Sequence, residues 1–194
     1  MAIVVNLLGT PGAGKSTGAS YIFAKLKMAG INAELITEFA KDKVWESNDT
    51  ALNDQIYVFA KQNYKMFRCN EKVDVIVTDA SLLNSILYNK NELYKKELND
   101  LVLKVFNNYK NMTYLIERVK PYNPIGRYQT QQQADKLKQP IIEILNDCNV
   151  KYKIKQGTMT SYDSIVDEIL KVLSLIDEKK KSKNKQQIKD DFCK

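Results

Sequence analysis

The chain has 194 residues, of which 44% are hydrophobic and 27% are charged, and its formal net charge is +7. This length suits one α/β domain with a sizeable core and leaves too little chain for the multidomain machinery of large motor ATPases. The sequence contains no histidine, which excludes Ser-His-Asp and Cys-His catalysis and most zinc chemistry.

The first predicted element is a buried strand at residues 3–8, where the sequence is almost entirely apolar. This opening segment lacks the basic region of a signal peptide, and no apolar run in the chain approaches the length of a membrane span. We therefore expect a cytoplasmic protein that makes no membrane contact.

Directly after this strand the sequence matches the phosphate-binding pattern G-x-x-x-x-G-K-[ST] in full. The predicted nucleotide contacts are Gly9, Thr10, Pro11, Gly12, Ala13, Gly14, Lys15, Ser16 and Thr17. Glycines let the backbone curl so that its N–H groups face phosphate oxygens, Lys15 reaches the β- and γ-phosphates, and the Ser16 hydroxyl can ligate Mg²⁺. A helix predicted at residues 15–28 points its positive dipole end at the same phosphates. The motif therefore predicts a site for ATP and Mg²⁺.

The rest of the chain alternates between predicted strands and helices. Further strands are predicted at residues 33–37, 73–78, 112–116 and 150–155, and helices at residues 39–45, 50–68, 81–88, 92–109, 130–147 and 162–176. The helix at 130–147 is expected to kink near Pro140. This order predicts an α/β, P-loop NTPase fold with a five-stranded parallel sheet, helices on both faces and a short lid, all in one domain over residues 1–178.

Acidic residues follow the second and third predicted strands. Ligands bind at the carboxyl ends of the strands in open parallel sheets, and Glu38 and Asp79 stand at those ends. Asp79 occupies the position of the Walker-B carboxylate, so we predict that it joins Ser16 in holding Mg²⁺. The alternative interpretations are a helix N-cap for Asp79 and a solvated loop charge for Glu38.

Arginine is scarce, and its positions are therefore informative. Two of the three arginines, Arg118 and Arg127, bracket a loop with proline and glycine after the fourth predicted strand. A planar guanidinium can neutralise charge on a transferring phosphoryl group, so we predict a catalytic lid at about residues 118–130. The alternative interpretation is that both are ordinary surface arginines, in which case the loop only connects the fourth strand to the following helix.

Taken together, these motifs resemble the compact P-loop kinases of the nucleoside, nucleotide and ribosylnicotinamide type, including bacteriophage versions. The resemblance covers about residues 3–160. Residues 37–41 resemble the acidic motif whose glutamate faces the acceptor hydroxyl, and residues 77–81 resemble the acidic motif after strand three. Gln62 is similar to a helix glutamine placed near the acceptor, while Arg118 and Arg127 resemble lid arginines.

Two departures from that family stand out. Residues 79–81 read Asp-Ala-Ser and lack the arginine of the Asp-Arg-Ser motif of many deoxynucleoside kinases. The loop at residues 121–129 is not the long lid of the zinc or adenylate-kinase type. The motifs thus specify phosphoryl transfer better than they specify the acceptor.

One helical stripe bears on that acceptor. Gln55, Phe59 and Gln62 are spaced by four and three residues, which places two amides around one ring on a single helix face. An amide can pair with a base edge and a ring can stack on it. The stripe therefore predicts base recognition, and the alternative is that Phe59 is a core residue and the glutamines are solvated.

The resemblance implies an ATP-dependent phosphotransferase that moves the γ-phosphoryl group to a free nucleoside, nucleotide or related small molecule. Its implied catalytic residues are Lys15, Glu38, Asp79, Arg118 and Arg127. One alternative is a kinase that acts on a hydroxymethylated pyrimidine in DNA, which the positive net charge keeps open. Another is a P-loop ATPase or switch that phosphorylates nothing.

The last segment, residues 179–194, is basic and poor in apolar residues, and we predict a flexible tail. Such a tail is either simply solvated or an electrostatic contact for nucleic acid.

Overall fold

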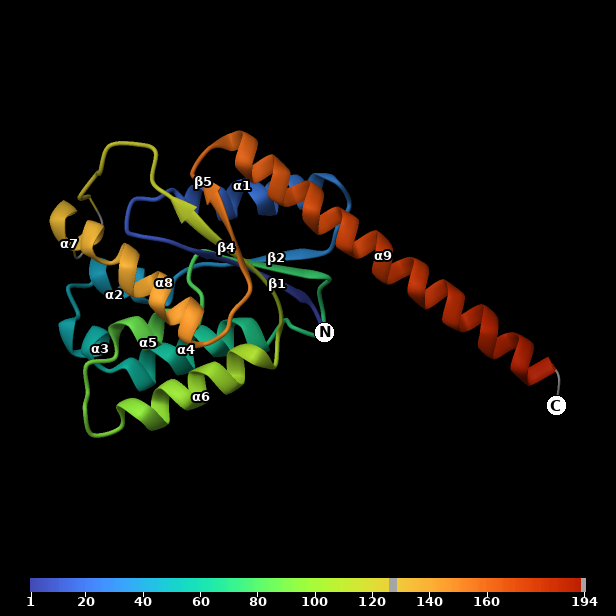
Figure 1. Ribbon diagram of the computed structural model, residues 1–194, viewed down its shortest axis with the longest axis horizontal. Coiled ribbons are helices and arrows are strands. Elements are labelled where there is room, and N and C mark those ends of the chain that lie inside the picture. Colours follow the sequence, from blue (N-terminus) through green and yellow to red (C-terminus); the bar gives the residue numbers. More distant parts are fainter. Residues whose placement is uncertain (126–128, 193–194) are drawn as a thin grey trace.

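Five parallel strands form one sheet in the order β2-β3-β1-β4-β5 (Figure 1). The computed structural model describes residues 1–125 and 129–192, with side chains in the last helix described to residue 178. The strands are β1 (Ile3–Leu8), β2 (Ala33–Ile36), β3 (Val75–Thr78), β4 (Lys110–Glu117) and β5 (Tyr152–Gln156). The predicted α/β fold with a five-stranded parallel sheet is confirmed.

Strand β1 lies at the centre of the sheet, and all six of its residues are buried. Alternate residues of a strand face opposite sides of the sheet, and helices cover both sides here. Ile3, Val5 and Leu7 pack with helices α1 (Lys15–Met28) and α9 (Met159–Phe192). Val4 and Leu8 belong to the opposite core cluster. The sheet is thus buried between two layers.

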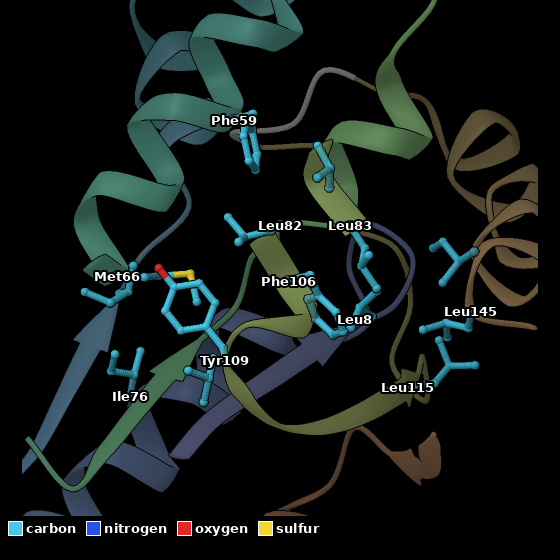
Figure 2. Packing of buried hydrophobic residues seen from close by; sticks show 14 of the residues in the cluster. Leu8, Phe59, Met66, Ile76, Leu82, Leu83, Phe106, Tyr109, Leu115 and Leu145 are labelled. Carbon is cyan, nitrogen blue, oxygen red and sulfur yellow. The ribbon is translucent and has the colours of Figure 1, made fainter. Parts of the chain in front are cut away.

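The second layer contains most of the helices. They are α2 (Phe39–Trp45), α3 (Asp49–Asn53), α4 (Gln55–Phe67), α5 (Asn84–Tyr88), α6 (Lys95–Asn107), α7 (Gln131–Lys136) and α8 (Lys138–Asp147). Figure 2 shows side chains of the sheet, such as Leu8 and Leu115, pointing into the same cluster as Phe59, Phe106 and Leu145 from the helices.

Two helices predicted as single elements are each divided in two. The segment at 50–68 breaks at Asp54, whose carboxylate accepts a hydrogen bond from the Tyr57 amide and caps the start of α4. The segment at 130–147 divides at Leu137 rather than kinking at Pro140. Pro140 instead stands in the first turn of α8, where a missing N–H group costs no helical hydrogen bond.

Helix α9 projects beyond the sheet toward the C-terminus (Figure 1). Its backbone continues as a helix through residues 179–192, so the flexibility predicted for this segment stays a prediction. Among residues 1–125 and 129–192, no helix combines the length and the apolar character that crossing a membrane requires.

A cluster of polar contacts fastens α9 to the edge of the sheet. The Glu168 carboxylate accepts hydrogen bonds from the Tyr114 hydroxyl at 2.8 Å and from Lys153 and Lys155 at 2.9 and 3.0 Å. Burial alone would raise the pKa of Glu168, but these hydrogen bonds and the Lys155 charge outweigh it and lower that pKa to about 2.

This shift predicts how stability depends on pH. Because the folded pKa of Glu168 lies below the unfolded value, its contribution is present above about pH 4.5 and is lost as the pH falls toward about 2. We expect Glu168→Gln to lower the free energy of unfolding at neutral pH by about 2 kcal/mol. Urea unfolding should show this difference shrinking in acid, whereas the exposed control Glu71→Gln should change little throughout. A pH-independent difference for Glu168→Gln would contradict the assignment.

Candidate functional site

The phosphate-binding loop connects β1 to α1 at the carboxyl edge of the sheet. Gly12 and Gly14 have φ angles of +82° and +96°, a region that side-chain-bearing residues rarely adopt. Gly14 is also the N-cap of α1 and has no side chain that could cap the helix. The first amides of α1 are therefore left for another acceptor, and a helix N-terminus of this kind suits a phosphate group.

Lys15 holds its charge over this loop. Its ammonium donates hydrogen bonds to the carbonyl oxygens of Gly9 at 2.8 Å and Thr10 at 3.1 Å. These bonds place the cation on the loop itself, where the negative oxygens of a bound phosphate would replace the carbonyls as stronger acceptors.

Two residues from the end of the domain brace the loop, and sequence reasoning missed both. The buried Tyr162 of α9 donates its hydroxyl to the Gly14 carbonyl at 3.0 Å. Its ring lies where a Cβ of Gly18 would be. Gly157, just after β5, approaches the Ala13 carbonyl so closely that a side chain there would overlap it. The only sequence signal was that Gly157 stands two residues after the strand predicted at 150–155, since Tyr162 reads as an ordinary helix residue.

The two predicted carboxylates meet at the ends of β2 and β3. These strands pair in parallel with Ile36 opposite Thr78, so the residues that follow them lie side by side. The buried Asp79 carboxylate accepts a hydrogen bond from the backbone amide of Glu38 at 3.0 Å. With Ser16, both acids line one cavity of about 320 Å³. The fold therefore brings together residues that the sequence places in three separate segments.

The electrostatics of this cavity centre on Glu38. Burial is the main cause that raises the pKa of Glu38 above its ordinary value; Lys15 opposes the shift and Asp79 adds to it. The negative charge of Glu38 in turn adds to the effect of burial in raising the pKa of the Tyr88 hydroxyl on α5. Sequence reasoning did not identify this electrostatic interaction of Tyr88 with Glu38.

The donors that face the cavity suit Mg²⁺. The hydroxyl of Ser16 and the carboxylate of Asp79 are hard oxygen ligands that line the same space. Within the described part of the chain, no group of three or more His, Cys, Asp or Glu residues could hold a metal alone. Mg²⁺ commonly takes one or two protein ligands and completes its shell with phosphate oxygens and water, so Ser16 and Asp79 would be enough for an ion that arrives with nucleotide.

Arg118 lies against the phosphate loop. Its guanidinium forms an ion pair with Asp135 of α7, and its Cζ lies 5.4 Å from the centroid of the Tyr122 ring. A Cβ at Gly12 would lie 3.1 Å from that ring and 3.6 Å from the Arg118 Cδ. The Nη1 nitrogen of Arg118 is buried and has no hydrogen-bond partner among the described residues. The predicted partner arginine, Arg127, lies outside the described residues.

The stripe predicted to read a base is the buried face of α4. Phe59 belongs to the core (Figure 2), as the alternative interpretation had it, but both glutamines are buried and not solvated as that interpretation expected. The Gln62 amide accepts from the backbone N–H of Phe39 at 2.9 Å and donates to the Ala80 carbonyl at 3.4 Å. Gln55 is also buried and donates to the Leu52 carbonyl. Gln62 therefore joins the two acidic loops to each other, and base recognition by the stripe stays a prediction.

One comparison with known proteins agrees with the phosphate loop. The family model described as "AAA domain" matches residues 4–161, which is most of the chain. A search of curated proteins found no match.

The brace on the loop gives a testable prediction. Tyr162→Phe keeps the ring but removes the hydroxyl that holds the Gly14 carbonyl, and we expect ATP affinity to fall about fivefold, the value of one hydrogen bond. The matched control is Tyr21→Phe, because the Tyr21 hydroxyl bonds Asp163 in the same α1–α9 contact without touching the loop. Isothermal titration should separate the two variants. Equal ATP affinities would show that Tyr162 does not position the loop.

Proposed function

We propose that this chain, which belongs to the AAA domain family of P-loop NTPases, is an ATP-dependent phosphotransferase. The observation that carries the proposal is the carboxylate of Glu38 in the wall of a cavity that begins at Ser16 of the phosphate loop. A donor phosphate on the loop and an acceptor in the cavity would then be neighbours. The resemblance to nucleoside and nucleotide kinases supports the same arrangement.

The size of the cavity favours transfer over hydrolysis. An ATPase needs room for one attacking water, whose share of liquid volume is about 30 Å³. The cavity measures about 320 Å³, which lies in the range of small-molecule sites. Apolar Leu35 and Trp45 line it together with charged Lys41 and Asp42. Such a lining suits an acceptor that has both a ring and polar groups.

In the proposed reaction an acceptor hydroxyl donates a hydrogen bond to Glu38. The oxygen of the acceptor hydroxyl attacks the γ-phosphorus. The bond from that phosphorus to the β–γ bridging oxygen breaks, and ADP leaves. The hydroxyl proton passes to the Glu38 carboxylate. Lys15 and Arg118 offset the negative charge at the phosphates. Bound Mg²⁺, held by Ser16 and Asp79, would supply further charge neutralisation at the phosphate oxygens.

The acceptor is the open part of the proposal. A free nucleoside, nucleotide or related small molecule fits the cavity, and a hydroxymethylated pyrimidine within DNA is the second candidate because the chain carries a net charge of +7. The test is a panel of nucleosides, nucleotides, nicotinamide riboside and hydroxymethylpyrimidine DNA, each incubated with ATP labelled at the γ-phosphate. We expect label transfer above hydrolysis for one class. Hydrolysis that no acceptor stimulates would show a non-kinase ATPase.

Substitution of the two carboxylates separates their proposed roles. We expect Glu38→Gln to bind ATP·Mg²⁺ normally and to lower the transfer rate by about 10²- to 10⁴-fold, because the acceptor proton loses its base. Asp79→Asn should weaken Mg²⁺-dependent ATP binding as well, because a metal ligand is lost. Titration with a non-hydrolysable ATP analogue and single-turnover transfer assays measure the two effects.

The control for these variants is Glu46→Gln, which neutralises an exposed acid at the end of α2 that pairs with Lys43. It should change neither ATP binding nor transfer. Lost nucleotide binding in Glu38→Gln, with binding intact in Asp79→Asn, would reverse the two roles.

A further inference from the structure

The solvent face of α4 carries a row of alternating rings and cations. Tyr57, Lys61, Tyr64 and Arg68 are spaced by four, three and four residues, so they share one side of the helix and its C-terminal end. All four are exposed, and Tyr64 as a residue is 63% exposed. We call these four residues the α4 row. It lies opposite the buried stripe of the same helix.

Within α4 the charge has one sign, and the nearest acid in the chain is Asp54, whose carboxylate caps the start of the helix at the Tyr57 amide. Helix α4 contains no acidic residue, and its cations are Lys61 and Lys65, with Arg68 following directly. The Lys61 ammonium lies 5.4 Å from the centroid of the Tyr57 ring, which holds a cation beside an aromatic face. On neighbouring α2 the acids are already paired, Asp42 with Lys65 and Glu46 with Lys43. The row therefore presents rings and positive charge together.

The row begins beside the cavity. The Tyr57 ring meets the Phe39 ring edge-on, with centroids 5.4 Å apart. Phe39 directly follows Glu38, the proposed acceptor-facing acid. Trp45, at the other end of α2, lines the cavity and is 63% exposed. A ligand along the row would thus reach aromatic side chains at the edge of the cavity.

We propose that the α4 row binds single-stranded nucleic acid, with bases stacked on Tyr57 and Tyr64 and phosphates at Lys61 and Arg68. Proteins that hold single strands combine exposed rings with a basic track. Tyr57 and Tyr64 lie seven positions apart, which is about 10 Å along the helix and the length of about three nucleotides at 3.4 Å each. A duplex fits less well because its base faces are stacked away from such rings.

Charge argues against a second copy of the chain as the occupant. A two-fold contact through this face would place the same patch of both copies against each other. The cations Lys61 and Arg68 of both copies would then oppose one another, and the described part of α4 offers no carboxylate to neutralise them. A polyanion meets no such repulsion.

This inference goes beyond the proposed function, because binding of a strand needs neither ATP nor phosphoryl transfer. It is tested by the fluorescence anisotropy of a labelled oligothymidylate with the full chain at about 50 to 200 mM salt. We expect Tyr64→Ala to weaken binding about 5- to 150-fold by removing one stacking surface. Lys61→Ala should make the slope of log affinity against log salt less steep by about 0.7, the value of one phosphate contact on a single strand.

The matched controls are Leu101→Ala and Lys104→Ala, which remove an exposed apolar side chain and an exposed lysine from α6. Neither should change binding. Circular dichroism of each variant checks that it is folded, and a duplex of equal length should compete poorly.

Unchanged binding in folded Tyr64→Ala would overturn the proposal by placing any nucleic-acid contact elsewhere, such as the basic C-terminal segment. The proposal would also be overturned if the chain bound no oligonucleotide but formed a dimer that Tyr64→Ala dissociates. Either result leaves the transfer assays, and the proposed function, unaffected.

Discussion

The parallel pairing of β1 with both of its neighbours is the constraint on which the site depends. It ends β1, β3 and β4 at one edge, and the pairing of β2 with β3 adds the loop that carries Glu38. One edge of the sheet therefore carries the phosphate loop, both acids and Arg118, although these lie in separate segments of the sequence. The buried apolar faces of β1 keep this register, because a shift by one residue would exchange the two core clusters. The chemistry of the edge thus rests on the packing of the sheet.

The site itself works against the stability of the fold. Glu38 sits where burial disfavours its charge, beside the carboxylate of Asp79. The fold offsets this by fixing the surrounding backbone: Gln62 bonds to both acidic loops, and Tyr162 bonds to the phosphate loop. Each of these side chains holds the backbone of a loop that carries a group of the site. Polar side chains that brace a strained or charged site in this way preorganise it, so that less has to move when ligands bind.

Local patterns in the sequence were enough to predict the sheet, the phosphate loop and the positions of Glu38, Asp79 and Arg118. What they could not predict depends on contacts between distant segments. Spacing alone does not tell the buried face of α4 from a binding face, so it left both interpretations of the stripe open, and only the packing shows that the Phe59 ring lies in the core. The bond from Tyr162 to Gly14 joins residues 148 positions apart, and no local pattern carries such information. The division of the helix at 50–68 depends on the side chain of Asp54, which read as one polar residue among several.

The two proposals meet at the rings of Phe39 and Trp45. A cavity of about 320 Å³ has room for one nucleoside-sized group, whereas the α4 row is built for a run of several nucleotides. If the acceptor is a nucleotide within a strand, its neighbours on the row would supply binding energy at a distance from the reacting hydroxyl. Binding energy of that kind can orient the acceptor toward Glu38 and so raise the transfer rate. A free nucleoside, which binds only in the cavity, would react more slowly. If the acceptor is a free molecule, the row contributes nothing to the reaction and serves to place the enzyme on nucleic acid. The dependence of the transfer rate on strand length distinguishes these two relationships, because only the first couples the row to the chemistry.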